Sequence, residues 1–133
     1  MKKISLFSLV VMMLALASCK KSDEQLRAEA VAGAYDCYSN CSVTDLVTQD
    51  LPTVTLDTAI LYVGLPYDSK NGFVSMMGKE IYLETDYSFR ISVTNYSLTG
   101  KFDGEGGLLF AIDEIDANAQ TRSQCSYICQ IRP

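Results

Sequence analysis

The stretch that decides the fold is CYSNC, residues 37–41, together with its counterpart CSYIC, residues 125–129. Each stretch holds two cysteines four positions apart. Residues four apart in an extended strand share a face but stand about 13 Å apart, because a strand rises about 3.3 Å per residue. A disulfide requires Cα atoms within about 7 Å of each other. If both stretches are extended, the disulfides must therefore join the first stretch to the second.

Two ways of joining the stretches remain. An antiparallel arrangement joins Cys37 to Cys129 and Cys41 to Cys125, whereas a parallel one joins Cys37 to Cys125 and Cys41 to Cys129. An even number of strands running up and down favours the antiparallel arrangement, which we predict. The other residues expected on the cysteine face are Tyr35, Tyr127 and Ile131. Ile128 is expected on the opposite face.

Between the two cysteine stretches, apolar and polar residues alternate with a period of two. The clearest example is residues 87–94, in which Tyr87, Phe89, Ile91 and Val93 alternate with polar side chains. The predicted strands are 35–41, 54–63, 72–77, 79–83, 87–94, 96–103, 108–112 and 124–131. No segment among them has a helical period. We therefore predict an all-β domain, a small antiparallel up-and-down barrel of about seven or eight strands.

A short helical tether is expected before the barrel, within residues 19–32. Ser22 can cap the helix, with Gln25 as its capping-box partner, and Gly33 is a plausible stop. The first 18 residues look different again. Lys2 and Lys3 precede an apolar run, residues 4–17, which is too short to span a bilayer as a helix and fits a secretory signal.

The end of that run, Leu16-Ala17-Ser18-Cys19, resembles the bacterial lipobox, which implies cleavage before Cys19 and lipidation of its thiol. The resemblance implies a lipoprotein signal peptide at 1–18, a lipidated tether at 19–32 and a β-barrel domain at 33–133. Lipid chains at Cys19 would make the membrane a partner without a spanning helix. The Lys-rich, then acidic stretch that follows resembles the export signal of Bacteroidetes surface lipoproteins. We expect the protein to be anchored at the outer membrane, and the export signal makes the cell surface the candidate side.

A second resemblance concerns the domain itself. Gly33-Ala34-Tyr35 opening the first strand, a meander, and a Gly-containing strand before an aromatic one resemble small lipocalin-like (calycin-like) lipoproteins of Bacteroidetes. The likeness implies a barrel that holds a small hydrophobic ligand. The lipocalin pattern has Trp where this chain has Tyr35.

Composition excludes several functions. The chain has no histidine, which rules out Ser-His-Asp and Cys-His nucleophiles and His-ligated metals. Without residues 1–18, nine basic residues face sixteen acidic ones, a poor balance for binding nucleic acid. An even cysteine count in an exported chain indicates disulfides, although four thiolates on a zinc ion are the alternative. We expect no enzyme activity, no cofactor, no metal and no nucleic-acid partner.

Several polar or aromatic residues are candidates for a site. Asp103 with Glu105, and Asp113 with Glu114 and Asp116, are acidic clusters that could bind calcium, but we interpret them as turn and loop residues. The tyrosines expected outside the core are Tyr38, Tyr62, Tyr67 and Tyr82. Asp57-Thr58-Ala59 resembles a short O-glycosylation pattern of Bacteroidetes exported proteins, and a plain strand is the other interpretation.

The resulting hypothesis is a lipid-anchored, non-enzymatic module that binds a small ligand, a glycan or a protein. The alternatives are an inhibitor of a hydrolase such as lysozyme, and a structural subunit of a surface assembly. A ligand binder should enclose a pocket. An inhibitor should present a protruding loop, for which GLPYDSKNG at 64–72 is the candidate. An assembly subunit should leave a long unpaired strand edge.

Overall fold

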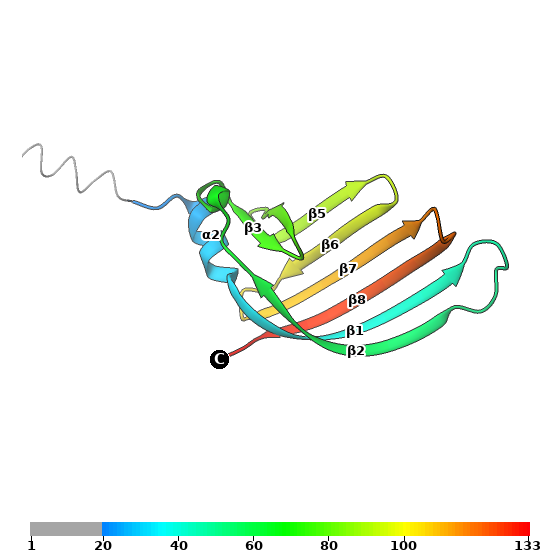
Figure 1. Ribbon diagram of the computed structural model, residues 1–133. Helices are drawn as coiled ribbons and strands as arrows, with labels where there is room; N and C mark the ends of the chain where they lie inside the picture. Colours follow the sequence, from blue (N-terminus) through cyan, green and yellow to red (C-terminus); the bar gives the residue numbers. More distant parts are fainter. Residues whose placement is uncertain (1–19) are drawn as a thin grey trace, which may run out of the picture.

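The computed structural model describes residues 20–133, so the predicted signal peptide and Cys19 lie outside the described residues. One short helix precedes eight strands (Figure 1), which confirms the all-β prediction. The elements are α2 (Asp23–Val31), β1 (Gly33–Asp45), β2 (Thr53–Val63), the 3-10 helix η1 (Tyr67–Asn71), β3 (Phe73–Met76), β4 (Lys79–Tyr82), β5 (Ser88–Val93), β6 (Tyr96–Phe102), β7 (Gly107–Asp116) and β8 (Thr121–Ile131). Within residues 20–133, no helix has the length and apolar character needed to cross a bilayer.

The strands form two antiparallel sheets that, contrary to the predicted up-and-down barrel, do not close. Six strands follow the order β2-β1-β8-β7-β6-β5, and β3 and β4 form a separate two-stranded sheet. Strands β3 and β4 have four residues each, about 13 Å, whereas β2 and β8 have eleven, about 36 Å. The short hairpin therefore spans the space between β2 and β5 only at the α2 end, where Gly64 pairs with Ser75. At the other end the two edge strands of the large sheet, β2 and β5, lie apart (Figure 1).

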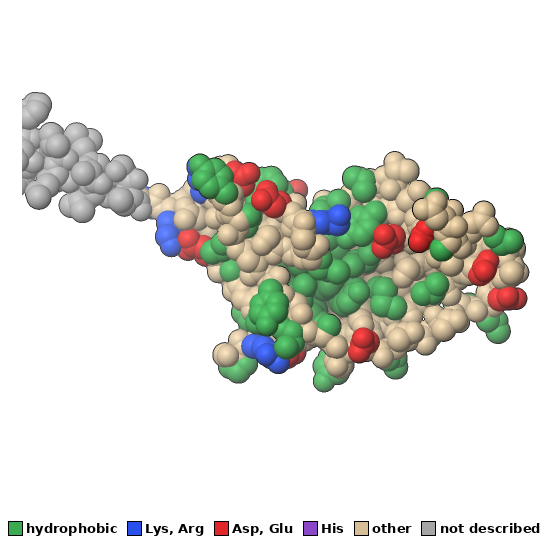
Figure 2. Space-filling view, viewed as in Figure 1, with side chains coloured by type: hydrophobic (Ala, Val, Ile, Leu, Met, Phe, Trp, Pro, Cys, Tyr) green, Lys and Arg blue, Asp and Glu red, His purple; other side chains and the backbone are tan. Residues whose placement is uncertain are grey.

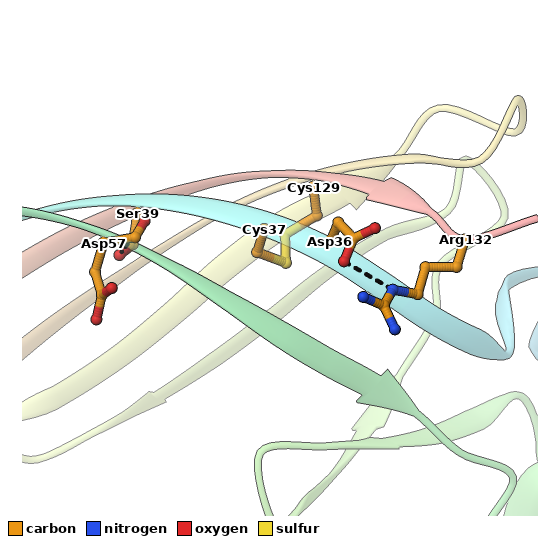
Figure 3. The surroundings of a disulfide bond; sticks show 6 residues. All are labelled: Asp36, Cys37, Ser39, Asp57, Cys129 and Arg132. Atoms are coloured by element: carbon orange, nitrogen blue, oxygen red, sulfur yellow. Dashed lines mark hydrogen bonds and ion pairs between the residues drawn. A yellow bond between two sulfur atoms is a disulfide. The ribbon is translucent and has the colours of Figure 1, made fainter.

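Two disulfides join β1 to β8, which lie side by side in the large sheet. Cys37 stands directly opposite Cys129, and Cys41 opposite Cys125. Each pair is bonded, with its Cα atoms 4.0 Å apart. Figure 3 shows the Cys37–Cys129 bridge. This is the antiparallel arrangement, and it fixes the register of the first strand against the last.

The register divides the large sheet into two faces. The inner face carries the cysteines and, as predicted, Tyr35, Tyr127 and Ile131, while Ile128 lies on the outer face. The largest fully buried side chains are Tyr35, Phe102, Met76, Ile81, Leu83, Leu98, Leu108 and Val74. The core thus lies between the inner face and the β3–β4 hairpin.

Helix α2 packs on the domain through Ala28 and Val31, which are buried in the same core. The Tyr35 hydroxyl donates a hydrogen bond of 2.8 Å to the Val31 carbonyl. As predicted, Ser22 caps the helix by accepting from the Gln25 amide at 3.1 Å. The Gln25 side chain donates to Glu29 instead of closing a capping box.

Gly100 shows why a glycine interrupts β6. A Cβ added at this position would lie 2.4 Å from the Phe89 ring and 2.6 Å from Cβ of Phe110. Both distances are too short for a contact between non-bonded carbon atoms. The glycine therefore leaves room over β6 for the Phe89 ring from β5 and the side chain of Phe110 from β7.

The two disulfides should stabilise the fold in a coupled manner. On the chain-entropy model, removing Cys41–Cys125 alone (both to Ala) should lower the free energy of unfolding by about 3 kcal/mol, because the remaining bridge still closes the long loop. Removing both bridges should cost about 7 kcal/mol, more than the sum of the single losses. Urea unfolding followed by circular dichroism measures both. Strictly additive losses would contradict the coupling.

Candidate functional site

The outer face of the sheet carries seven large hydrophobic side chains, each at least 45 % exposed. We call this group the outer patch; its members are Tyr38, Val54, Leu56, Ile60, Tyr62, Leu109 and Ile128. They come from β1, β2, β7 and β8, which are consecutive strands of the sheet. Single exposed apolar residues are ordinary, but a contiguous group of this kind indicates an interaction surface.

Cross-strand register makes the outer patch continuous. Leu109 stands opposite Ile128, Ile128 opposite Tyr38, and Tyr38 opposite Thr58. This row crosses four strands and ends at the edge of the sheet. Leu56 and Ile60 lie two positions on either side of Thr58, so they share its face. The patch therefore reaches the edge strand β2.

The hollows of the outer face are open. One, of about 630 Å³, lies between Tyr38, Ile60 and Arg132. A second, of about 680 Å³, runs over short polar residues such as Asn40, Thr99 and Ser126. Neither is the enclosed chamber that a bound small ligand would need.

Charges around the outer patch are neutralised in pairs. Arg132 donates to Asp36 at 2.8 Å (Figure 3), and Arg122 donates from Nε to Asp113 at 2.9 Å. The Arg122 guanidinium lowers the pKa of the Asp113 carboxyl. Hydrogen bonds from Ser88 and from Lys101 lower the pKa of Asp86 to about 2. Paired charges leave the surface between them apolar and without strong net charge.

Strand β2 exposes its backbone as well as its side chains. Directly opposed residues whose Cα atoms lie closest form the non-hydrogen-bonded pairs of an antiparallel ladder. Cys37 and Cys129 are such a pair, so Cys37 directs its N–H and C=O toward β2 and bonds Ala59. Alternation then turns the backbone groups of the even residues of β2 outward. Gly64 supports this, because its N–H and C=O both bond Ser75, on the side away from β1.

The residues of β2 with outward backbone groups are Val54, Leu56, Thr58, Ile60 and Tyr62. Within residues 20–133, no strand pairs with this edge beyond Gly64. One outward N–H is covered locally, since the Asp57 carboxylate accepts from the Thr58 amide at 2.7 Å. The Ser39 hydroxyl donates to the Asp57 carbonyl, and both residues are labelled in Figure 3. The rest of the edge is free to accept another strand.

The inner face is only partly covered. Figure 2 shows hydrophobic side chains gathered over the middle of the molecule, next to the β3–β4 end. Ile91, Tyr96, Ile112 and Tyr127 are partly buried there and pack against the core. The Lys79 ammonium lies 4.6 Å from the centre of the Tyr96 ring, which links the hairpin to the sheet.

The first acidic cluster makes the predicted turn, whereas the loop interpretation of the second is wrong, because Asp113 and Glu114 lie on strand β7. Asp103 accepts from the amides of Glu105 and Gly107, both at 2.8 Å, which makes the predicted turn and lowers the pKa of Asp103. Asp116 accepts from two amides in the β7–β8 turn. Asp113 and its neighbour Glu114 point to opposite faces of β7. No group of three or more potential metal ligands occurs in the described part of the chain.

The tyrosine prediction is confirmed, since Tyr38, Tyr62, Tyr67 and Tyr82 are all exposed. Only Tyr38 and Tyr62 belong to the outer patch. The candidate inhibitory loop at 64–72 contains η1 and packs against α2, where the Ser22 hydroxyl donates to the Lys70 carbonyl at 2.9 Å. Cys19, the predicted lipidation site, lies outside the described residues.

Sequence reasoning missed the aliphatic part of the outer patch. Residues 54–63 are apolar at even and at odd positions, a pattern typical of a strand buried on both faces. The same pattern on an edge strand instead leaves Leu56 and Ile60 in solvent. Comparisons of the chain with protein-family models, with characterised proteins and with solved structures gave no match.

The outer patch should contribute little to folding. Leu56→Ser should change the free energy of unfolding by less than about 0.5 kcal/mol, because the side chain is 76 % exposed. Leu98→Ala, at a side chain that is 0 % exposed, should cost about 2–5 kcal/mol. Urea titration in dilute solution compares the two. Equal losses would show that the outer patch belongs to the core.

The free energy of unfolding should fall at acid pH partly because the Asp86 carboxylate becomes protonated. Its folded pKa of about 2 lies below the ordinary value of about 3.9, so the ionised carboxylate stabilises the fold above about pH 4. That contribution is lost as the pH falls from about 4 through 2. The urea midpoint of Asp86→Asn should therefore drop less between pH 5 and pH 2 than that of the wild type. Ser88→Ala, which removes a donor to Asp86, should act in the same direction; drops equal to the wild type in both variants would refute the lowered pKa.

Proposed function

We propose that the chain is a lipid-anchored, non-enzymatic binding module of the outer membrane, and that its ligand is a protein that adds a strand to β2. The observation that carries the proposal is the coincidence of two features on one edge. The outward backbone groups of β2 offer hydrogen bonds, and the outer patch beside them offers apolar contact. Strand addition uses both, with backbone bonds for affinity and side chains for specificity.

The composition of the outer patch supports a protein ligand. Protein interfaces are enriched in tyrosine and depleted of unpaired charge at their centre. Tyr38 and Tyr62 are 69 % exposed, and the charged residues nearby, Asp36 and Arg132, are bonded to each other. A surface of this kind fits a protein better than a nucleic acid.

The other candidate functions have less support. A small hydrophobic ligand would need a closed interior, and the open sheet offers surface hollows instead. An inhibitor of a hydrolase would need a protruding loop, whereas residues 64–72 pack against α2. A long unpaired edge is the feature expected of an assembly subunit, so that alternative is contained in the proposal. The lipobox resemblance supports the lipid anchor.

Site-specific photo-crosslinking in living cells tests the proposal. A benzophenone amino acid placed at Tyr38 or Tyr62 of the full chain should yield a covalent protein adduct on irradiation. Tyr67 is the matched control, since it is 87 % exposed but lies on η1, away from the outer patch. Adding Leu56→Lys, which places a charge on the edge, should remove the Tyr38 adduct. Equal adducts at Tyr67, or none at Tyr38 and Tyr62, would refute the proposal.

A further inference from the structure

The geometry points to a second copy of this chain as the strand that β2 accepts. The two β2 strands run antiparallel about a two-fold axis at Thr58, and the two six-stranded sheets become one. This inference rests on the proposed function, because it names the partner of the same edge. An interface in which both copies use the same surface is the commonest kind in homodimers.

The register follows from the length of the strand. β2 has eleven residues, Thr53–Val63, and Thr58 is its middle residue. Antiparallel pairing about Thr58 therefore overlaps the whole strand with its copy. All even residues, whose backbone groups point outward, then face even residues of the second copy. Each such pair exchanges two backbone hydrogen bonds, and at the central pair the Thr58 N–H exchanges its bond to the Asp57 carboxylate for one to the second copy.

Side chains agree with this register. On the outer face Leu56 meets Ile60 of the second copy, and Val54 meets Tyr62. On the inner face Asp57, the one charged residue of β2, meets Ala59. Moving the axis to Asp57 would place two carboxylates directly opposite each other, which is destabilising. Moving it to Ala59 would place Thr58 against Ile60.

The ends of the free edge agree as well. Pairing about Thr58 places Pro52 of the second copy opposite Gly64. Gly64 already bonds Ser75 with both backbone groups, so it has no place for another strand. Pro52 has no N–H and cannot continue a strand ladder. The incoming strand thus stops where the available edge stops.

Pairing also merges the two outer patches. The row Leu109–Ile128–Tyr38–Thr58 of one copy meets the same row of the other at Thr58. Leu56 and Ile60 flank this row on both sides of the axis. Dimerisation therefore extends an exposed apolar surface across the new seam and adds cross-strand contacts to the backbone bonds.

Cysteine crosslinking of the full chain tests the inference. Thr58→Cys should form a disulfide-linked dimer on oxidation, because directly opposed residues at a hydrogen-bonded pair have Cα atoms about 5.5 Å apart. Ser92→Cys is the matched control: it is exposed on the outer face of β5, at the opposite edge of the sheet. Non-reducing gels of membranes should show at least tenfold more dimer for Thr58→Cys. Equal yields would overturn the inference.

A second pair of variants keeps Thr58 and tests the register. Leu56→Cys and Ile60→Cys should each give little dimer alone, because their own copies lie four positions apart. Chains of the two variants expressed together should crosslink. Self-crosslinking of Leu56→Cys at the level of Thr58→Cys would overturn the register. Separately, a mass measurement that shows a glycan on Thr58 of the wild-type chain would overturn the dimer.

The two proposals can fail separately. A photo-adduct at Tyr38 with twice the mass of the chain supports both. A Tyr38 adduct with another protein, together with no Thr58→Cys dimer, overturns the second copy and leaves strand addition intact. Absence of any adduct overturns strand addition itself.

Discussion

The register between β1 and β8 is the constraint on which the rest of the structure depends. Two disulfides join directly opposed residues, so the first strand of the domain cannot slide against the last. A slip by one residue would carry every side chain of a strand to the other face. The bridges therefore hold Tyr35 in the core and Tyr38 in solvent. They also decide which backbone groups of β1 point toward β2.

That last consequence extends outward by one strand. Because Cys37 and Cys41 turn their N–H and C=O toward β2, the even residues of β2 turn theirs to the free edge. The short β3–β4 hairpin covers this edge only as far as Gly64. The spacing of the four cysteines thus determines both the register at the centre of the sheet and the direction of the free backbone groups at its edge.

Much of this could be predicted from the sequence. Eight strands were predicted at the places where they occur, most of them from period-two alternation, and the cysteine spacing predicted the pairing of the first and last strands. Closure of the sheet could not be predicted, because strand count alone does not say whether residues 73–82 reach along the whole gap. The outer patch was missed for a related reason. A run such as Leu56 to Tyr62 predicts a strand that is buried on both faces, and only its place in the strand order shows that one face is exposed.

Most edge strands are protected by lysine, proline or a bulge. Between Thr53 and Val63, β2 has neither lysine nor proline, and its pairing with β1 is unbroken. Its one protective feature is Asp57, whose carboxylate covers a single amide and would lie diagonally from its copy in a dimer, about 7–8 Å away. Two exposed carboxylates at that distance repel weakly in salt. An edge with so little protection does not by itself prevent pairing with unrelated strands. Its selectivity must therefore come from the register of pairing, which Thr58, Pro52 and Gly64 determine.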